Sequence, residues 1–191
     1  LGLQQDGSPV MGMVTRLVGH KGVDLVRSVA EGLLDQGIQL VILGNGEHAY
    51  EAFFGDLAAR HPGRVGVYIG FVPPLARKIY AGADLFLMPS KSEPCGLAQM
   101  VACRYGTIPI VRETGGLKDS IHDSGDGAGN GFTFQQYNAH DLYEACWRAK
   151  EGYWKKEGWP VLVRRAMQCD FSWNNSSRSY IDMYEQMMNL W

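Results

Sequence analysis

The 191-residue sequence lacks the signals of several large protein classes. No apolar run approaches the roughly 20 residues that a membrane-spanning helix requires. An excess of charge of one sign is also missing, because the sequence has 18 Lys and Arg and 20 Asp and Glu. A nucleic-acid-binding module would show a basic excess or a basic stripe. We therefore expect neither a membrane nor a nucleic acid as a partner.

Cysteine and metal-binding motifs are sparse. The four cysteines stand at positions 95, 103, 146 and 169 and form no C-x-x-C pair, which argues against a disulfide framework and favours a reducing compartment. There is no H-E-x-x-H and no Asp-x-Asp motif, so we expect no metal and no cofactor. The sequence also lacks G-x-x-x-x-G-K-[ST] and G-x-S-x-G, which argues against a P-loop NTPase and an α/β hydrolase.

Glycine is in excess, with 24 residues or about 13% against a usual share of about 7%. Between the glycines, apolar strands alternate with helical patterns. Strands are predicted at 10–14, 38–43, 65–69, 84–88, 107–111 and 132–134. Helices are predicted at 23–34, where Gly37 ends the pattern, at 47–60, 74–81 and 97–105, and from 116. The glycine-rich run 124–131 predicts a mobile surface loop.

The strands are apolar on both faces, as in a parallel sheet covered by helices. The fold class is therefore α/β, a Rossmann-like doubly wound parallel sheet with C-terminal helices. We expect one domain over 1–191, with a linker remnant at 1–9, an α/β core at 10–137 and a helical part at 138–191. In that part Asn138 caps a helix, and two more helices follow at 159–167 and 176–190.

Ligands of doubly wound sheets bind at the carboxyl ends of the strands, so the loops that follow strands are the candidate site. The first loop carries Arg16 and Lys21, which could clamp a diphosphate; the alternative is that both are ordinary surface cations. The second loop, 44–49, fits the dinucleotide pattern G-x-G-x-x-G/A. No acid follows the next strand, so we interpret Gly44 and Gly46 as a tight turn that lets the backbone approach a ligand.

The third loop places Glu93 just before a helix whose first amides are unpaired. Glu93 could accept sugar hydroxyls while the amides of Cys95, Gly96 and Leu97 donate to others. The alternative is that Glu93 only caps the helix.

The fourth loop contains Thr114, Gly115 and Gly116, again between a strand and a helix. Paired glycines at such a place let phosphate oxygens reach backbone amides, although a tight turn explains them equally well. Elsewhere, Trp147, Trp154 and Trp159 could line a carbohydrate surface or belong to the core.

Together these loops resemble the C-terminal half of bacterial glycogen synthases and plant starch synthases, the retaining ADP-glucose glucosyltransferases of glycosyltransferase family 5. The matching stretches are 16–22, 85–89, 92–97, 105–109, 113–117, 130–134 and 170–173. Related glycosyltransferases outside this family carry a second glutamate where this sequence has Val101, which favours the starch and glycogen synthase branch.

The resemblance implies the nucleotide-sugar half of a two-domain GT-B enzyme, cytoplasmic and bacterial. Arg16 and Lys21 would hold the diphosphate, Glu93 the glucose, and Phe71 would stack on adenine, although it lacks the hydroxyl of the tyrosine often found there. The residues expected to meet the sugar and phosphates with their backbone are Cys95, Gly96, Leu97, Thr114, Gly115 and Gly116. Because the chain begins Leu1-Gly2-Leu3, we expect a fragment without its N-terminal domain, inactive by itself.

The implied substrates are ADP-glucose and an α-1,4-glucan, and the implied product is ADP. Two other functions stay open at this stage. One is another GT-B glycosyltransferase with a UDP-sugar donor, and the other is a non-catalytic module that binds nucleotide or glucan. A Rossmann dehydrogenase is disfavoured by the missing acid after the 44–49 loop.

Overall fold

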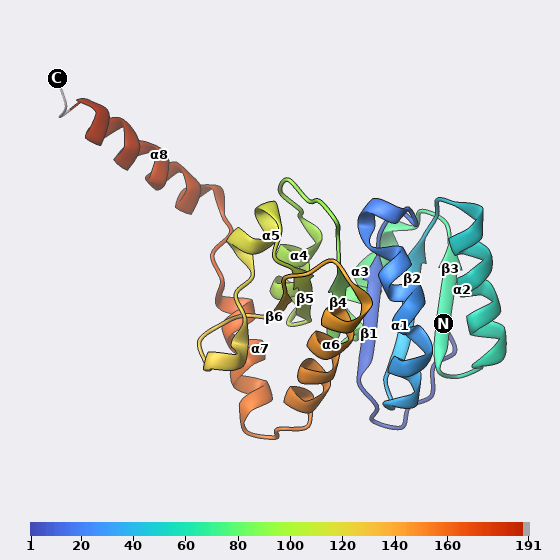
Figure 1. Cartoon of the computed structure of the whole chain (residues 1–191). Coiled ribbons are helices and arrows are strands. Elements are labelled where there is room, and N and C mark those ends of the chain that lie inside the picture. Colours follow the sequence, from blue (N-terminus) through green and yellow to red (C-terminus); the bar gives the residue numbers. More distant parts are fainter. Residues whose placement is uncertain (189–191) are drawn as a thin grey trace.

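The computed structural model describes residues 1–188, apart from the side chain of Asp126 (Figure 1). It contains one six-stranded, fully parallel sheet with the strand order β3-β2-β1-β4-β5-β6. The strands are β1 (Val10–Val14), β2 (Gln39–Gly44), β3 (Val65–Ile69), β4 (Leu85–Met88), β5 (Ile108–Arg112) and β6 (Phe132–Phe134). This is the order of a doubly wound Rossmann sheet, which confirms the predicted fold class.

Helices cover both faces of the sheet, as the apolar strands require. They are α1 (Val23–Asp35), α2 (His48–Arg60), α3 (Pro73–Gly82), α4 (Ala98–Tyr105), α5 (Gly115–Ser120), α6 (Ala139–Tyr153), α7 (Gly158–Gln168) and α8 (Trp173–Met188), with short 3-10 turns η1 (Gly19–Lys21) and η2 (Ser124–Asp126). On one face α1 packs between α2 and α6, and on the other α4 packs between α3 and α7 (Figure 1). None of the helices in residues 1–188 has the length and apolar character to cross a membrane.

Two predicted helix boundaries are explained by their caps. After α1, Gly37 adopts φ 82°, and the amides of Gly37 and Ile38 donate to the carbonyls of Leu34 and Leu33 at 2.9 and 3.2 Å. This Schellman arrangement satisfies the last carbonyls of the helix and turns the chain into β2. At the start of α6, the Asn138 side chain accepts a hydrogen bond from the Asp141 amide at 2.8 Å, which confirms the predicted N-cap.

Hydrogen bonds anchor both ends of the glycine-rich run 124–131, whose mobility stays a prediction. The Ser124 amide donates to the Gly131 carbonyl at 2.9 Å, and Asn130 is buried, with its Oδ1 accepting from the His122 amide at 2.8 Å. Arg165 of α7 donates to the Gly129 carbonyl at 2.7 Å. Composition alone does not predict the contacts with His122 and Arg165, since both of these partners lie outside the run.

The last helix stands apart from the rest. α8 begins at Trp173, three residues before the predicted start at 176, and no residue of it is buried. Figure 1 shows it running away from the sheet and its covering helices. The predicted end at 189–190 lies outside the described residues.

Phe86 lies at the centre of β4 and is fully buried, whereas Phe71 is 86% exposed after β3. We predict that Phe86→Ala lowers the free energy of unfolding by about 3–5 kcal/mol, through lost burial and the cavity left behind. Phe71→Ala, the matched control, changes it by less than about 0.5 kcal/mol. Urea unfolding followed by circular dichroism measures both, and equal effects would contradict the burial described above.

Candidate functional site

The candidate site lies where the chain order of the sheet reverses, between β1 and β4. The loops after these two neighbouring strands touch each other through their backbones. The Lys91 amide donates to the His20 carbonyl at 2.9 Å. A β-carbon on Gly22 would come 2.1 Å from the Pro89 carbonyl oxygen, and Gly22 has φ 76°. Only glycine permits this approach, which brings the polar side chains of both loops together.

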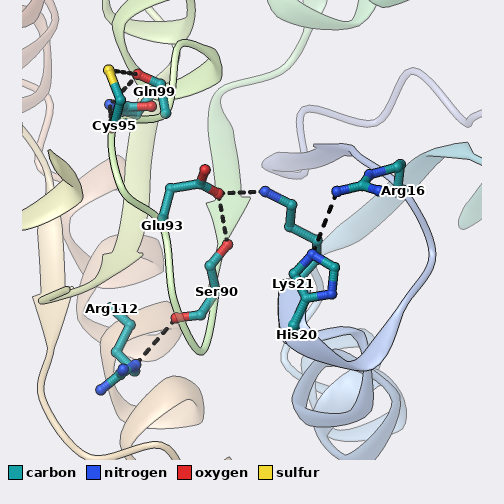
Figure 2. A network of polar contacts seen from close by, with 9 residues as sticks. Arg16, His20, Lys21, Ser90, Glu93, Cys95, Gln99 and Arg112 are labelled. Atoms are coloured by element: carbon teal, nitrogen blue, oxygen red, sulfur yellow. Dashed lines mark hydrogen bonds and ion pairs between the residues drawn. The ribbon is translucent and has the colours of Figure 1, made fainter. Parts of the chain in front are cut away.

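An ion pair bridges the two loops. Lys21 Nζ lies 2.6 Å from Glu93 Oε2, and the same oxygen accepts a hydrogen bond from the Ser90 hydroxyl at 3.2 Å (Figure 2). Glu93 is only 9% exposed. Glu93 Oε1 has no hydrogen-bond partner in the part of the chain that the structure describes. The structure therefore unites two of the predicted catalytic residues and leaves one carboxylate oxygen available.

Glu93 is not the cap of α4. The N-cap position of α4 is Leu97, and no side chain hydrogen-bonds to this end of the helix. The Glu93 carboxylate is instead turned toward Lys21 and Ser90 (Figure 2). The sequence left open that Glu93 only caps the helix, and its contacts with Lys21 and Ser90 do not fit that alternative.

Arg16 lies beside a second feature, a pocket of about 200 Å³ at the ends of β1, β2 and β3. Its lining includes Arg16, Gly44 and Phe71, three predicted site residues from three different loops. The Arg16 side chain is exposed, and its Nη2 lies 3.5 Å from His20 Nε2 (Figure 2). Gly46 is not part of this lining. The pocket combines an apolar wall with one cation, which suits a flat heteroaromatic ring next to an anionic group.

Four predicted glycines make close contacts within the protein itself. A β-carbon on Gly44 or Gly46 would lie 1.8 or 2.2 Å from the carbonyl oxygens of Thr15 and Leu17. A β-carbon on Gly115 would lie 2.2 Å from the Glu93 carbonyl oxygen, and one on Gly116 would lie 2.2 Å from the Cys95 carbonyl oxygen. The glycines let neighbouring loops pack backbone to backbone. Whether a ligand also approaches them stays a prediction.

The amides of the third and fourth loops differ in what they already bind. The Gly116 amide donates to the Glu93 and Pro94 carbonyls at 3.1 and 3.2 Å, and the Thr114 amide donates to Arg112. Within residues 1–188 the Gly115 amide donates to no protein group, and neither do those of Cys95, Gly96 and Leu97. These four amides are the ones open to a ligand.

Buried Gln99 of α4 holds the third loop, which carries Glu93 and Cys95, through hydrogen bonds. Its Nε2 donates to the carbonyls of Cys95 and Gly96 at 3.2 and 3.0 Å, and to the Ser120 hydroxyl at 3.1 Å. The Cys95 side chain is exposed, and Gly96 has φ 75°. The loop therefore turns its carbonyls toward Gln99, where they are satisfied.

Sequence reasoning missed two residues that hold the site together. Arg112, at the end of β5, donates to the carbonyls of Ser90 and Lys91 at 3.1 and 2.5 Å. The Tyr137 hydroxyl contacts Asp24 at 2.5 Å and the Gly19 carbonyl at 3.1 Å. Burial and the hydrogen bond to Asp24 raise the pKa of Tyr137, so its hydroxyl stays a donor.

The only signal for Arg112 was a cation ending an apolar strand, and Tyr137 carried none. The described residues hold no cluster of three or more His, Cys, Asp and Glu side chains that could bind a metal ion.

Gly22 and Gly37 offer a matched pair of substitutions. Both have positive φ, but a β-carbon on Gly37 meets nothing within 4 Å. We predict that Gly37→Ala costs only the left-handed strain, about 1–2 kcal/mol of unfolding free energy. Gly22→Ala adds the collision with Pro89, for a further loss of about 1–3 kcal/mol. Urea unfolding compares the two, and equal losses would show that the two loops are not in backbone contact.

Comparison with known proteins agrees with this geometry. The family model of the group 1 glycosyl transferases matches residues 2–158. The chain is 51% identical over 185 residues to a glycogen synthase of Geobacillus thermodenitrificans and 49% identical over 187 residues to one of Bacillus cereus. These alignments cover 96% and 97% of this chain. The chain spans only 38% and 39% of the length of those two relatives.

A solved structure extends the similarity to the fold. The catalytic domain of starch synthase IV from Arabidopsis thaliana, bound to ADP and acarbose, superimposes with a TM-score of 0.88 at 40% identity. The match covers 97% of this chain and 40% of that one. The six-stranded sheet thus has its counterpart in a GT-B glycosyltransferase structure. With its loops, its fold and its sequence in agreement, this chain belongs to the group 1 glycosyltransferases, and it is homologous to glycogen and starch synthases.

Proposed function

We propose that this chain is the donor-binding domain of a glycogen or starch synthase, which transfers glucose from ADP-glucose to the non-reducing end of an α-1,4-glucan with retention. The observation that carries the proposal is the Lys21–Glu93 pair at the reversal of the sheet, beside a pocket that Arg16 and Phe71 line. The second domain of the GT-B fold and most contacts to the acceptor would lie in the rest of a longer chain.

Positive charge on Arg16 and Lys21 stabilises the diphosphate as it leaves the anomeric carbon. A lysine ammonium carries three donors, so Lys21 can keep Glu93 and still bind a phosphate oxygen. The Arg16 guanidinium is exposed and offers a planar pair of donors to the same group. No metal or cofactor is needed for this role in the proposal. The Gly115 amide, next to Thr114 and Gly116, adds a neutral donor for phosphate.

Glu93 positions the glucose instead of attacking it. Oε2 already accepts hydrogen bonds from Lys21 and Ser90, which hold the carboxylate in one orientation. Oε1 is left to accept a sugar hydroxyl, and the amides of Cys95, Gly96 and Leu97 can donate to others. A sugar fixed in this way presents its anomeric carbon to the acceptor hydroxyl on the face that the diphosphate leaves.

The adenine is assigned to the 200 Å³ pocket, where Phe71 supplies an exposed ring. The related starch synthase IV was solved with ADP and acarbose, which supports ADP and glucan as ligands of this chain. The proposal includes a reducing, cytoplasmic compartment in a bacterium, supported by the four free cysteines and the bacterial relatives. The chain alone is expected to bind donor without elongating glucan, and robust elongation of glycogen by it would contradict this.

Removal of either cation tests the diphosphate assignment. We predict that Arg16→Ala and Lys21→Ala each weaken ADP binding by about 1.5–3 kcal/mol, roughly 10- to 150-fold in Kd, because each removes a charge-assisted contact. Isothermal titration calorimetry measures the change. Arg60→Ala removes an exposed cation at the far end of α2 and should leave Kd unchanged. Unaltered affinity in both site variants would favour the non-catalytic module.

The choice of nucleotide separates the proposal from a UDP-sugar enzyme. We predict that ADP binds at least about tenfold more tightly than UDP, because the larger purine covers more of Phe71 and its pocket. Phe71→Ala should reduce this preference while sparing stability. Calorimetry with both nucleotides decides the matter, and tighter binding of UDP would overturn the ADP-glucose assignment.

A further inference from the structure

A wide hollow lies away from the proposed donor site. Its volume is about 770 Å³, and we call it the α6–α7 pocket. Its lining comes from η2 and the glycine-rich loop, β6, the C-terminal half of α6 and α7, and it includes Trp147, Arg148, Glu151, Lys155, Trp159 and Arg165. None of the predicted donor-site residues takes part.

The topology sets this pocket at the opposite end of the sheet. α6 follows the parallel strand β6 and runs back across the sheet, so its C-terminal half ends near the amino ends of the strands. In Figure 1 the connection between α6 and α7 lies at the bottom, and the turn after β1 lies at the top. A ligand bound here would leave the donor site free.

Two tryptophans give the pocket an aromatic wall. Trp147 of α6 is 46% exposed, a large share for an indole on the surface of this helix. Trp159 of α7 is partly buried and packs edge-to-face on Tyr153, with ring centroids 5.3 Å apart, so its orientation is fixed. Gly152 belongs to the same lining, and a β-carbon there would come 3.1 Å from the Phe132 ring and 3.9 Å from the Trp159 ring. Both indoles therefore form part of the wall of one hollow.

The polar groups of the pocket are largely balanced in charge. Arg148 lies 2.9 Å from the Asp123 carboxylate, and Arg165 donates to the Gly129 carbonyl. Glu151 pairs with Lys150 at 3.3 Å, while Lys155 and Glu157 stand at the lining with opposite signs. Such a lining attracts neither a phosphate nor a cation in particular. It suits a neutral ligand that offers hydroxyls to these groups and apolar C–H faces to indole rings.

We propose that the α6–α7 pocket binds an α-glucan chain at a site separate from the reacting end. This inference rests on the proposed function, which makes a long glucan the acceptor. A second binding site for the same polymer raises the effective concentration of its chain ends at the donor site. Two tryptophans in one lining together with charge-balanced donors and acceptors carry the assignment.

Native gel electrophoresis of the 191-residue chain through gels containing glycogen tests the site. We expect glycogen to retard the chain, and we expect Trp147→Ala to weaken the apparent Kd about tenfold. Trp159→Phe, which keeps an aromatic ring on α7, should give a smaller loss. Trp154→Ala is the matched control, since Trp154 is 56% exposed on the same connection but does not line the pocket. It should leave retardation unchanged.

The outcomes separate this inference from the function on which it rests. Loss of retardation in Trp147→Ala with unchanged ADP binding supports the α6–α7 pocket. An equal loss of retardation in Trp154→Ala overturns the inference. Absence of retardation in the parent chain also overturns it, and would favour a protein as the occupant of the pocket. Glu93→Gln, a change in the proposed donor site, should leave the retardation by glycogen unchanged. If the parent chain fails to bind ADP but is still retarded by glycogen, the proposed function fails and the glucan site stands.

Discussion

At Gly22 the backbone passes so close to the Pro89 carbonyl that a β-carbon would lie 2.1 Å from its oxygen, and the candidate site is built around this contact. β1 and β4 are neighbours in the sheet although two strands separate them along the chain. Their loops can meet in this way only because Gly22 has no side chain at the crossing. Because they do meet, Lys21 from one loop and Glu93 from the other form an ion pair 2.6 Å long.

Two residues outside these loops, Arg112 and Tyr137, hold them in place through hydrogen bonds. Arg112 fixes the Ser90 and Lys91 carbonyls, and Tyr137 ties the Gly19 carbonyl to Asp24. Arg112 is the last residue of β5, and Tyr137 follows β6. A charge that is already oriented loses little entropy when a diphosphate binds, which is the physical benefit of such bracing. The proposed donor site and the α6–α7 pocket lie at opposite ends of the same sheet.

Much of this arrangement could be predicted from local patterns. Alternating apolar strands and helices predicted the parallel sheet, and strand boundaries differ by a residue at β2, predicted at 38–43 and found at Gln39–Gly44. The loops after strands could be assigned to one edge by topology alone. Arg112 and Tyr137 could not be found, because their partners are backbone carbonyls and, for Tyr137, the carboxylate of Asp24, all remote in the chain and marked by no local pattern. The hydrogen bonds that tie the run 124–131 to His122, Asp123 and Arg165 could not be predicted either, since those partners lie outside the run.

The sequence by itself determined the α/β class, the end of α1 at Gly37 and the loops that carry Arg16, Lys21, Glu93 and Phe71, because periodicity, caps and motif spacing are local properties. Only the tertiary structure decided that Glu93 faces Lys21 instead of capping α4, and that the Gly116 amide donates to the carbonyls of Glu93 and Pro94. It alone also placed Trp147 and Trp159 around one hollow and left Trp154 outside. These are matters of distance between segments remote in the chain, which depend on how the loops and helices pack.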